Sequence, residues 1–416
     1  MNKKSDILII GGGIIGVSAA YYLAKEGMAV TLVEKGEICS GSSYGNAGFI
    51  PPSHSTPIPG PGVLKQGIKW MLNPESPFYI HPRFDVEFVR WLWRFGNYCN
   101  KSAYERAIPL FRDIQRDSLA LFQEIMEQED IVCDFKQAGG ITIFKSKNGF
   151  AHAQAEVKEM KNFDIELDFL DGDAVRKLEP MIRDDVLGGI HNMEDAHLNP
   201  ALFVEELAKV AEKYGARIIR QAEVLGFEKA GGRIASVHTT CESFHPKEVI
   251  LAAGAWSTPL AQQLDLQFPM QAAKGYSLTM KKPAQTPSRS LFLSEARVAV
   301  TPIGSSLRFA GTLELAGLDL SINQRRVNAI KDAGRGYLNS VSSEDDPEVW
   351  SGLRPVPPDG LPYIGRSLTT KNLVVATGHG MLGVSMGPVT GKVVSEIVRA
   401  EKPCFDLDPF AVERFS

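Results

Sequence analysis

The stretch DILIIGGGIIG, residues 6–16, decides the fold of this chain. Its apolar first half predicts a buried strand, and the glycines predict a tight turn into a helix that runs to Gly27. In such a turn Gly11 allows the sharp bend, Gly13 lets the backbone approach a pyrophosphate, and Gly16 lets the helix pack closely on the strand. The N-terminus of that helix presents free N–H groups to the phosphates.

A second strand is expected at residues 30–33, and it ends in Glu34. A carboxylate about twenty residues after the glycines accepts both ribose hydroxyls and repels a 2′-phosphate, which argues against NADP. The order of strand, glycine loop, helix, strand and acid therefore predicts a Rossmann-like unit that binds an adenine dinucleotide. Its expected contacts are Gly11, Gly12, Gly13, Ile14, Ile15, Gly16, Glu34 and Lys35.

Length and composition narrow the function classes. The 416 residues are enough for two domains, and the net charge of −4 argues against a nucleic-acid surface. The five cysteines are scattered, which fits a reducing compartment and predicts no metal site. No apolar run reaches the roughly eighteen residues of a membrane span. We therefore expect a cytoplasmic protein, soluble or peripheral on the inner membrane.

The chain is expected to cross four times between an α/β domain and an α+β domain. Residues 51–62 are rich in proline and predict a rigid connector between them. Alternating strand patterns around residues 273–280, 297–303 and 307–313 predict an antiparallel sheet in the second domain. The cofactor-binding domain is predicted to comprise residues 1–62, 165–265 and 350–416, and the substrate or cap domain residues 63–164 and 266–349.

Three separated segments repeat the pattern of a strand that opens onto glycine, namely residues 7–16, 249–256 and 373–383. A nicotinamide site is usually one contiguous double unit, whereas FAD crosses a domain and contacts distant segments. The pattern therefore favours FAD. A helix N-terminus after the third segment would stabilise the negative charge of a reduced flavin. The alternative is three ordinary turns between strand and helix.

Four motifs carry a resemblance to a known family: SSYGNAG (42–48), KGYSL (274–278), GLRPVPPDG (352–360) and TGHG (377–380). With them the chain resembles the D-amino acid oxidase/glycine oxidase superfamily from end to end, and most of all the bacterial D-amino acid dehydrogenases. The resemblance implies FAD, an interleaved cofactor domain and oxidation of a carbon that bears an amine. Further expected cofactor contacts are Ser42, Ser43, Asn46, Ala47, Gly48, Val224, Ala253, Gly254, Trp256, Gly352, Gly378, His379, Gly380, Met381, Leu382 and Gly383.

Arg354 is the expected substrate anchor. A guanidinium presents paired donors that match a carboxylate, and it keeps its charge at every working pH. In the family that the chain resembles, this arginine clamps the substrate carboxylate beside the flavin. The alternative for Arg354 is a surface ion pair. Glycine-oxidase-like relatives add a strand tyrosine, but the matching position here is Ala299. Tyr276 is the best substitute, and an ordinary place in the core is an equal alternative for it.

Two histidines and a tyrosine complete the candidate site. His54 and Tyr44 could reach the flavin edge, or could only pack in the core or a loop. His379 is expected to contact the flavin through its backbone N–H, because the lone pair of a neutral amine expels the hydride without a protein base. No cysteine lies between Cys241 and Cys404, so a cysteinyl link has no donor and we expect non-covalent FAD.

These features predict an FAD-dependent D-amino acid dehydrogenase that passes electrons to a quinone or another acceptor. A glycine, D-proline or hydroxy-D-proline enzyme of the same fold is the near alternative. A flavin domain acting on modified transfer RNA and a non-catalytic electron-transfer subunit are distant alternatives; the net charge of −4 argues against the first and Arg354 against the second.

Residues 63–95 mix basic and aromatic side chains. One interpretation is a helical cap over the active site, with its tryptophans packed inward. The other is a surface that holds the protein on an anionic membrane without spanning it. The residues concerned are Lys65, Lys69, Arg94, Trp70, Met71, Phe78, Trp91 and Trp93.

Overall fold

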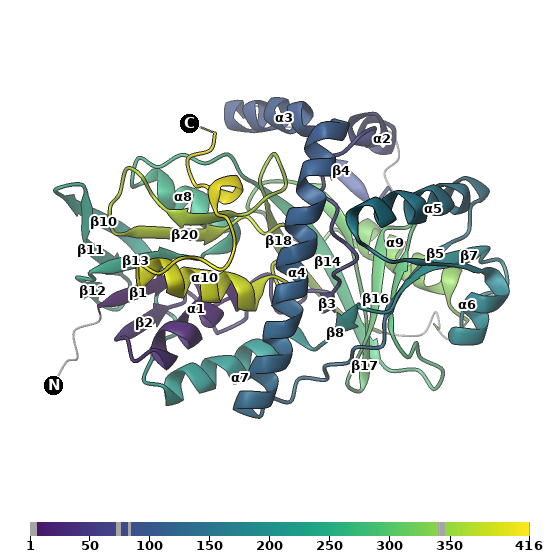
Figure 1. Cartoon of the computed structure of the whole chain (residues 1–416), viewed down its shortest axis with the longest axis horizontal. Coiled ribbons are helices and arrows are strands. Elements are labelled where there is room, and N and C mark those ends of the chain that lie inside the picture. Colours follow the sequence, from purple (N-terminus) through teal and green to yellow (C-terminus); the bar gives the residue numbers. More distant parts are fainter. Residues whose placement is uncertain (1–5, 72–75, 82–84, 340, 342–345, 416) are drawn as a thin grey trace.

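The computed structural model describes residues 6–71, 76–81, 85–339, 341 and 346–415. Two large sheets organise these residues, one of six and one of nine strands (Figure 1). The long helix α4 (Lys101–Glu129) runs between them and packs on both sides, because its Phe122 contacts Phe203 of the first part while Ile108 lies in a cluster of the second. The predicted class, a Rossmann-like unit with an α+β part, is confirmed.

The six-stranded sheet has the order β19-β20-β13-β1-β2-β9. Its strands are β1 (Ile7–Ile10), β2 (Val30–Val33), β9 (Arg217–Ile219), β13 (Glu248–Leu251), β19 (Tyr363–Arg366) and β20 (Leu373–Thr377). Neighbouring strands are parallel except for the antiparallel pair β19–β20. Both faces are covered, so the central strands β20, β13, β1 and β2 are almost wholly buried and mostly apolar rather than alternating.

One face of this sheet carries α1 (Ile14–Lys25), α7 (Pro200–Lys213) and α10 (Gly387–Val398). The opposite face carries α8 (Ser257–Gln262) and a three-stranded sheet of β10 (Val224–Ala230), β11 (Arg233–Thr239) and β12 (Ser243–Phe244). Helix α7 begins with a side-chain cap, since the Asn199 side chain accepts from the Leu202 N–H and Pro200 lies in the first turn.

The nine-stranded sheet has the order β18-β14-β17-β16-β15-β5-β7-β6, and β4 pairs with β17. Its strands are β4 (Phe78–Ile80), β5 (Gly140–Phe144), β6 (Asp168–Asp171), β7 (Gly188–Asn192), β14 (Gln271–Lys281), β15 (Ser290–Leu293), β16 (Val298–Ile303), β17 (Ser306–Leu315) and β18 (Glu348–Val356). The remaining elements are α2 (Val63–Met71), α3 (Val86–Tyr98), α5 (Lys147–Met160), α6 (Gly172–Leu178), α9 (Gln324–Tyr337) and the pair β3 (Phe49–Ile50) and β8 (Ala196–His197).

Three strands bear on the division into domains that the sequence suggested. β6 and β7 lie within 165–265 and most of β18 lies within 350–416, stretches that we assigned to the cofactor-binding domain. Their hydrogen bonds join them instead to the nine-stranded sheet. The two-domain division stays a proposal, and we now propose that residues 168–192 and 348–356 go with the second domain.

Candidate active site

The three glycine segments meet at one edge of the six-stranded sheet. β1, β13 and β20 are adjacent and parallel, so the residues that follow them lie side by side. A Cβ on Gly11 would lie 2.5 Å from the Ala252 carbonyl oxygen, and the Thr377 hydroxyl donates to the Gly254 carbonyl over 2.9 Å. The edge therefore forms one continuous surface, as expected for a long cofactor.

Two helices point their N-termini at this edge. A Cβ on Gly387 would lie 2.5 Å from the side chain of Ile14, and one on Gly391 would lie 2.5 Å from the backbone of Ser18. Because a step of four residues along α10 matches a step of four residues along α1, the two helices run parallel with their first turns in contact. The partial positive charges of two helix dipoles therefore gather at one place, which suits an anionic cofactor.

The polar groups at the first turn of α1 fit an adenine dinucleotide. The Ile14 N–H donates to the Ser43 hydroxyl over 3.1 Å. The Glu34 carboxylate accepts from the N–H groups of Gly12 and Gly36 at 2.6 and 2.9 Å. A hydroxyl beside the helix N-terminus and a carboxylate beside the glycine loop are the groups that phosphate and ribose need.

The residues predicted for the adenine end lie next to Glu34. The Ala222 N–H donates to the Glu34 carbonyl over 2.8 Å, which brings Val224 at the start of β10 to this place. The Lys35 ammonium lies 3.6 Å from the ring centre of Trp256, at the second glycine segment. Glu34, Lys35, Val224 and Trp256 are thus brought together.

The loop of residues 42–48 bridges the two sheets. The Ser42 hydroxyl donates to the Leu353 carbonyl of β18 over 2.5 Å. From the nine-stranded sheet, Arg308 Nη1 donates to the carbonyls of Tyr44 and Asn46 at 2.9 and 2.8 Å. These contacts are with the nine-stranded sheet, whereas the Ser43 hydroxyl accepts from the Ile14 N–H of α1 on the other side, so the loop is fixed between the two parts, where a cofactor lying across both would contact it.

Sequence reasoning missed two residues that hold this loop, Arg308 of β17 and Thr301 of β16. The Thr301 hydroxyl donates to the Ala47 carbonyl over 2.6 Å. Both residues are buried polar groups within otherwise apolar strands, and that pattern was the available signal. At the end of the loop, Gly48 has φ +75° and a Cβ there would lie 2.2 Å from the Leu198 carbonyl oxygen, so glycine is required.

Arg354 extends from β18 across its neighbour β14. A Cβ on Gly275 of β14 would lie 2.1 Å from Arg354 Nη1, so the side chain crosses where β14 has none. On the next strand, β17, the Thr312 carbonyl accepts from Arg354 Nη1 over 2.6 Å. Thr312 has φ +68° at a register shift of β17, an irregularity of the kind that re-aims groups beside active sites.

The guanidinium of Arg354 has no acidic partner among the ion pairs of the described residues. Burial lowers the pKa of Arg354 to about 10, so it remains charged at neutral pH. Burying a guanidinium whose protein partner is a carbonyl group costs free energy unless an anion binds to it. This argues against the alternative of a surface ion pair and is what a carboxylate site requires.

Small side chains lie between Arg354 and His54. Opposed residues of antiparallel strands share a face, and faces alternate along each strand. Trp350 lies on the same face of β18 as Arg354. It opposes Ser277 of β14, which opposes Ala310 of β17, and Ala310 opposes Ala299 of β16. The side chains of Ser277, Ala310 and Ala299 therefore lie on the face of the sheet that carries Arg354. Ala299 in turn opposes Phe292, against whose ring His54 packs edge-on at 5.6 Å.

Two glycines accommodate a large ring on this face. Trp350 lies against the loop at Gly45 and against Gly352, since a Cβ on either would overlap its ring at 2.0 or 1.8 Å. Gly352, an expected cofactor contact, is therefore covered by Trp350. Tyr44 lies at the same end, where its hydroxyl donates to Glu348 over 3.1 Å.

The prediction of Tyr276 as a second anchor is wrong. Tyr276 adjoins Ser277 on β14 and so lies on the other face from Arg354. Its hydroxyl donates to Glu314 over 2.8 Å, and its ring is 1% exposed in a cluster with Leu278. The alternative that we gave, a place in the core, is what the structure has.

His379 is buried at the third glycine segment. Its Nε2 lies 3.0 Å from the Thr390 hydroxyl of α10, and burial lowers the pKa of His379 to about 3. A neutral, engaged ring agrees with the expectation that it is no base. The Gly380 N–H donates to the Pro355 carbonyl over 2.8 Å, and the Met381 side chain is 49% exposed. Flavin contact by Gly378 to Gly383 stays a prediction.

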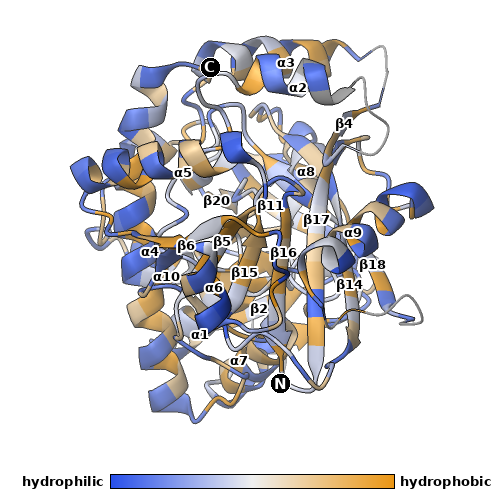
Figure 2. Ribbon diagram, turned by 90° about the vertical axis from the view of Figure 1, so that its right-hand side faces the viewer, coloured by the Kyte–Doolittle hydropathy of each residue, from blue (hydrophilic) through white to orange (hydrophobic). Residues whose placement is uncertain are grey.

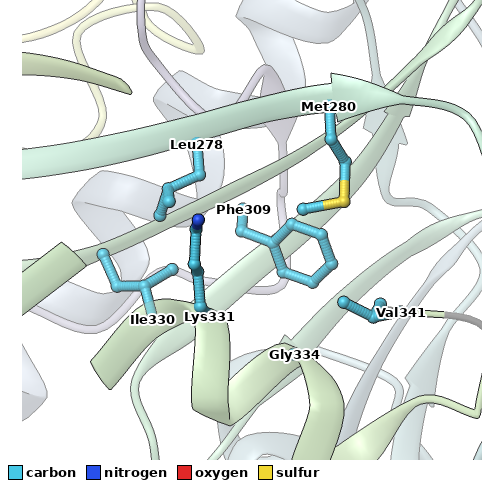
Figure 3. Close-up of a pocket in the computed structure, with 7 residues that line it drawn as sticks. All are labelled: Leu278, Met280, Phe309, Ile330, Lys331, Gly334 and Val341. Carbon is cyan, nitrogen blue, oxygen red and sulfur yellow. The ribbon is translucent and has the colours of Figure 1, made fainter. Parts of the chain in front are cut away.

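A recess on the far face of the nine-stranded sheet has no part in this site. Figure 3 shows it between α9 and strands β14 and β17, lined mostly by apolar side chains. It shares the face of Tyr276 and lacks converging polar groups. Within the described part of the chain no three His, Cys, Asp or Glu side chains gather to hold a metal.

Comparison with known proteins agrees with this geometry. The DAO family model, described as FAD dependent oxidoreductase, matches residues 6–397. The chain is 30% identical to "D-amino acid dehydrogenase 1" of Mesorhizobium japonicum over 99% of both chains. It is 29% identical to "D-amino acid dehydrogenase" of Vibrio atlanticus over 99% of this chain and 100% of that relative.

A solved structure has the same fold. Glycine oxidase from Geobacillus kaustophilus superposes with a TM-score of 0.80 at 21% identity, covering 98% of each chain. At that identity the likeness shows the fold alone. The family match over nearly the whole length identifies the cofactor as FAD. The chain belongs to the DAO family of FAD-dependent oxidoreductases.

Proposed function

We propose that this oxidoreductase is a D-amino acid dehydrogenase. The observation that carries the proposal is Arg354, a desolvated guanidinium with no acidic partner in the described chain, on the sheet face that the 42–48 loop covers. It would clamp the substrate carboxylate with paired hydrogen bonds. The curated relatives with this name, similar over 99% of the chain, support the same substrate class.

In the proposed reaction this chain orients and shields the substrate. Bound FAD supplies the acceptor, at N5, for the hydride from the substrate α-carbon. Arg354 fixes the carboxylate, and Ala299 and Ala310 leave room for the rest of the substrate toward Phe292 and His54. The imino acid product leaves and hydrolyses to a 2-oxo acid and ammonia. Positioning supplies most of the catalysis in this scheme.

The test is anaerobic bleaching of the flavin absorbance by single amino acids. A panel of D- and L-enantiomers with glycine, D-proline and hydroxy-D-proline separates the proposal from its near alternatives. We expect fast bleaching by acyclic D-amino acids. Bleaching confined to glycine or to the cyclic imino acids would assign the alternative, and bleaching by L-enantiomers would overturn the proposal.

We propose that FAD is bound without a covalent link. The cysteine at the cofactor edge, Cys39, donates its backbone N–H to the Gly12 carbonyl, and burial raises the pKa of its thiol to about 12. A thiol that stays protonated is a poor nucleophile. Acid precipitation should therefore release the yellow colour into the supernatant, whereas colour in the pellet would contradict this proposal.

For the electron acceptor we propose a quinone, reached by peripheral contact with the membrane. Helix α3 has two apolar sides: Phe88, Trp91 and Phe95 are buried, while others face outward. The outward residues are Val86, Val89 and Trp93, with 65%, 61% and 69% of their surface exposed. Figure 2 shows α3 and α2 together at one end of the molecule.

Both earlier interpretations of residues 63–95 thus have a part in this proposal. Trp91 packs inward, where its indole N–H donates to the Val356 carbonyl over 3.0 Å, as a cap would. Trp93 faces outward, as on a membrane surface, while the nearby Arg90 is paired with Glu87 over 2.6 Å. The side chains of Trp70 and Met71 lie outside the described part. Among the described helices, none has the length and apolar character to cross a bilayer.

A further inference from the structure

A chain of polar groups leads from a buried carboxyl to His54. Asp195 lies between β7 and β8 and is 5% exposed. Its carboxylate accepts from the Ser53 hydroxyl over 2.7 Å and from the Ser53 N–H over 3.2 Å. The same hydroxyl lies 3.5 Å from Nδ1 of His54. Ser53 therefore connects the Asp195 carboxyl with the imidazole that packs on Phe292.

The backbone around His54 is held independently of this chain of groups. The His54 N–H donates to the Pro51 carbonyl over 3.0 Å, and Gln115 Nε2 of α4 donates to the His54 carbonyl over 3.1 Å. The Ser55 hydroxyl donates to the Pro52 carbonyl over 2.6 Å. With the backbone fixed, a change at Asp195 reaches the ring through the Ser53 hydroxyl.

The direction of the hydrogen bonds depends on the proton of Asp195, since a serine hydroxyl has a single proton to donate. When Asp195 is ionised, Ser53 donates to it and accepts from Nδ1–H of His54, which leaves Nε2 as an acceptor. When Asp195 is protonated, it donates to Ser53, and Ser53 donates to Nδ1. The imidazole proton then sits on Nε2.

We propose that Asp195, acting through Ser53, determines whether Nε2 of His54 accepts or donates a hydrogen bond in the substrate pocket. This rests on the proposed function, in which the substrate amine lies between Arg354 and His54. An Nε2 acceptor takes a hydrogen bond from the amine N–H, whereas an Nε2–H opposes it. Asp195 and Ser53 are thus positioning residues.

The electrostatic surroundings put this switch in the working pH range. Burial, and to a smaller extent Glu194, raise the pKa of Asp195 to about 7 against the two Ser53 hydrogen bonds. β5 and β15 face the carboxyl with neutral Gly140 and Ser290. Lowering the pH through 7 therefore protonates Asp195.

His54 itself stays neutral across that range. Burial and the nearby Arg297 lower the pKa of His54 to about 4, and Arg297 in turn faces Glu156 and Glu295. The change at His54 is therefore a change of tautomer and not of charge, which is the property that a test must detect.

The first measurement is kcat/KM for a D-amino acid from pH 5.5 to 10. Protonation of the substrate amine lowers kcat/KM about tenfold per pH unit in every variant, and below pH 7 the parent enzyme should lose about a further tenfold per unit, an extra acidic limb that one more proton produces. This acidic limb should vanish in Asp195→Asn, whose amide does not titrate, and in Ser53→Ala, which interrupts the chain of groups. Ser53→Thr keeps a hydroxyl and should retain the limb. The matched control Ser55→Ala removes a hydroxyl from the same loop and should also retain it.

The second measurement is ring-nitrogen NMR of the holoenzyme with ¹⁵N-histidine. The His54 proton should move from Nδ1 at pH 8.5 to Nε2 at pH 5.5, and should not move in Ser53→Ala. An extra acidic limb that persists in both Asp195→Asn and Ser53→Ala, or a tautomer that is constant with pH, would overturn the inference. If no amino acid reduces the flavin, the proposed function fails, while the NMR result still decides the switch.

Discussion

Arg354 reaches over the nine-stranded sheet because its neighbours leave the path free. Gly275 offers no side chain on β14, and the left-handed Thr312 turns a carbonyl toward the guanidinium from β17. A threonine at φ +68° carries strain that the surrounding sheet must sustain. The site thus depends on two residues that take no part in chemistry: Gly275, which lies in the KGYSL motif but was given no role there, and Thr312, which no composition or motif argument points to.

Replacing Arg354 by lysine should raise KM strongly with FAD content unchanged. A point-charge ammonium cannot donate two parallel hydrogen bonds to a carboxylate. Losing one charge-assisted bond costs roughly 1.5–3 kcal/mol, about ten- to a hundredfold in kcat/KM. Steady-state kinetics with flavin absorbance as the measure of holoenzyme will test this, and an unchanged KM would place the carboxylate elsewhere.

Replacing Gly275 by alanine should reproduce that loss without touching the arginine. The new Cβ would lie 2.1 Å from Arg354 Nη1, so the guanidinium must move from Thr312. We expect kcat/KM to fall by about the same ten- to a hundredfold. The matched control is Gly336→Ala in α9, where nothing lies within 4 Å of the added Cβ. Equal kinetics for the two alanine variants would show that the path over β14 is not needed.

From the sequence, site residues can be proposed where a motif fixes the chemistry, but not where spatial register decides, and the roles of Arg354 and Glu34 stay predictions. Arg354 and Glu34 follow from the demands of a carboxylate and a ribose. Tyr276 failed because alternation along β14 orders its residues on two faces but does not say which face meets the site. Asp195 and Ser53 are far apart in the chain, so only the fold brings them together.

At the scale of elements, close contact between α1 and α10 fixes the cofactor edge. Gly391 lets the backbones of the two helices approach each other, and an added Cβ there would lie 2.5 Å from the backbone of Ser18. Overpacking of this kind costs about 1–3 kcal/mol. Gly391→Ala should therefore lower the melting temperature by a few degrees and weaken FAD retention on gel filtration. Gly336→Ala serves again as control; full FAD retention in Gly391→Ala would show that the helix spacing is not critical.

Element prediction succeeded where alternation is regular, as at β14, β16 and β17, and failed for β18. The sequence GLRPVPPDG contains prolines that resemble a loop, yet β18 is an edge strand, where a missing N–H is tolerated. β7 was missed because Gly188 and Gly189 weaken a strand pattern. There the glycines are needed for close packing: a Cβ on Gly188 would lie 2.3 Å from the Leu170 carbonyl oxygen of β6.

At the scale of the whole molecule, the exposed apolar side of α3 should bind anionic lipid. We expect co-sedimentation with anionic vesicles at low ionic strength. Salt should weaken the binding, because it screens the attraction between exposed basic side chains and the anionic lipid. A triple substitution of Val86, Val89 and Trp93 by serine should abolish binding and leave flavin reduction by amino acids intact. The control Val132→Ser changes an apolar residue that is 81% exposed elsewhere. A parent protein that stays in the supernatant would exclude this surface.

The sheet order β20-β13-β1 also governs when the protein can acquire its cofactor. β1 ends at Ile10, yet its neighbour β13 begins at Glu248 and β20 at Leu373. During synthesis β1 can pair with β2 early, but its other side stays unpaired until β13 has been made. The three glycine segments can hold one molecule of FAD together only after nearly the whole chain has left the ribosome. FAD can therefore bind only late in synthesis, and a shortage of FAD leaves a translated chain that lacks its cofactor.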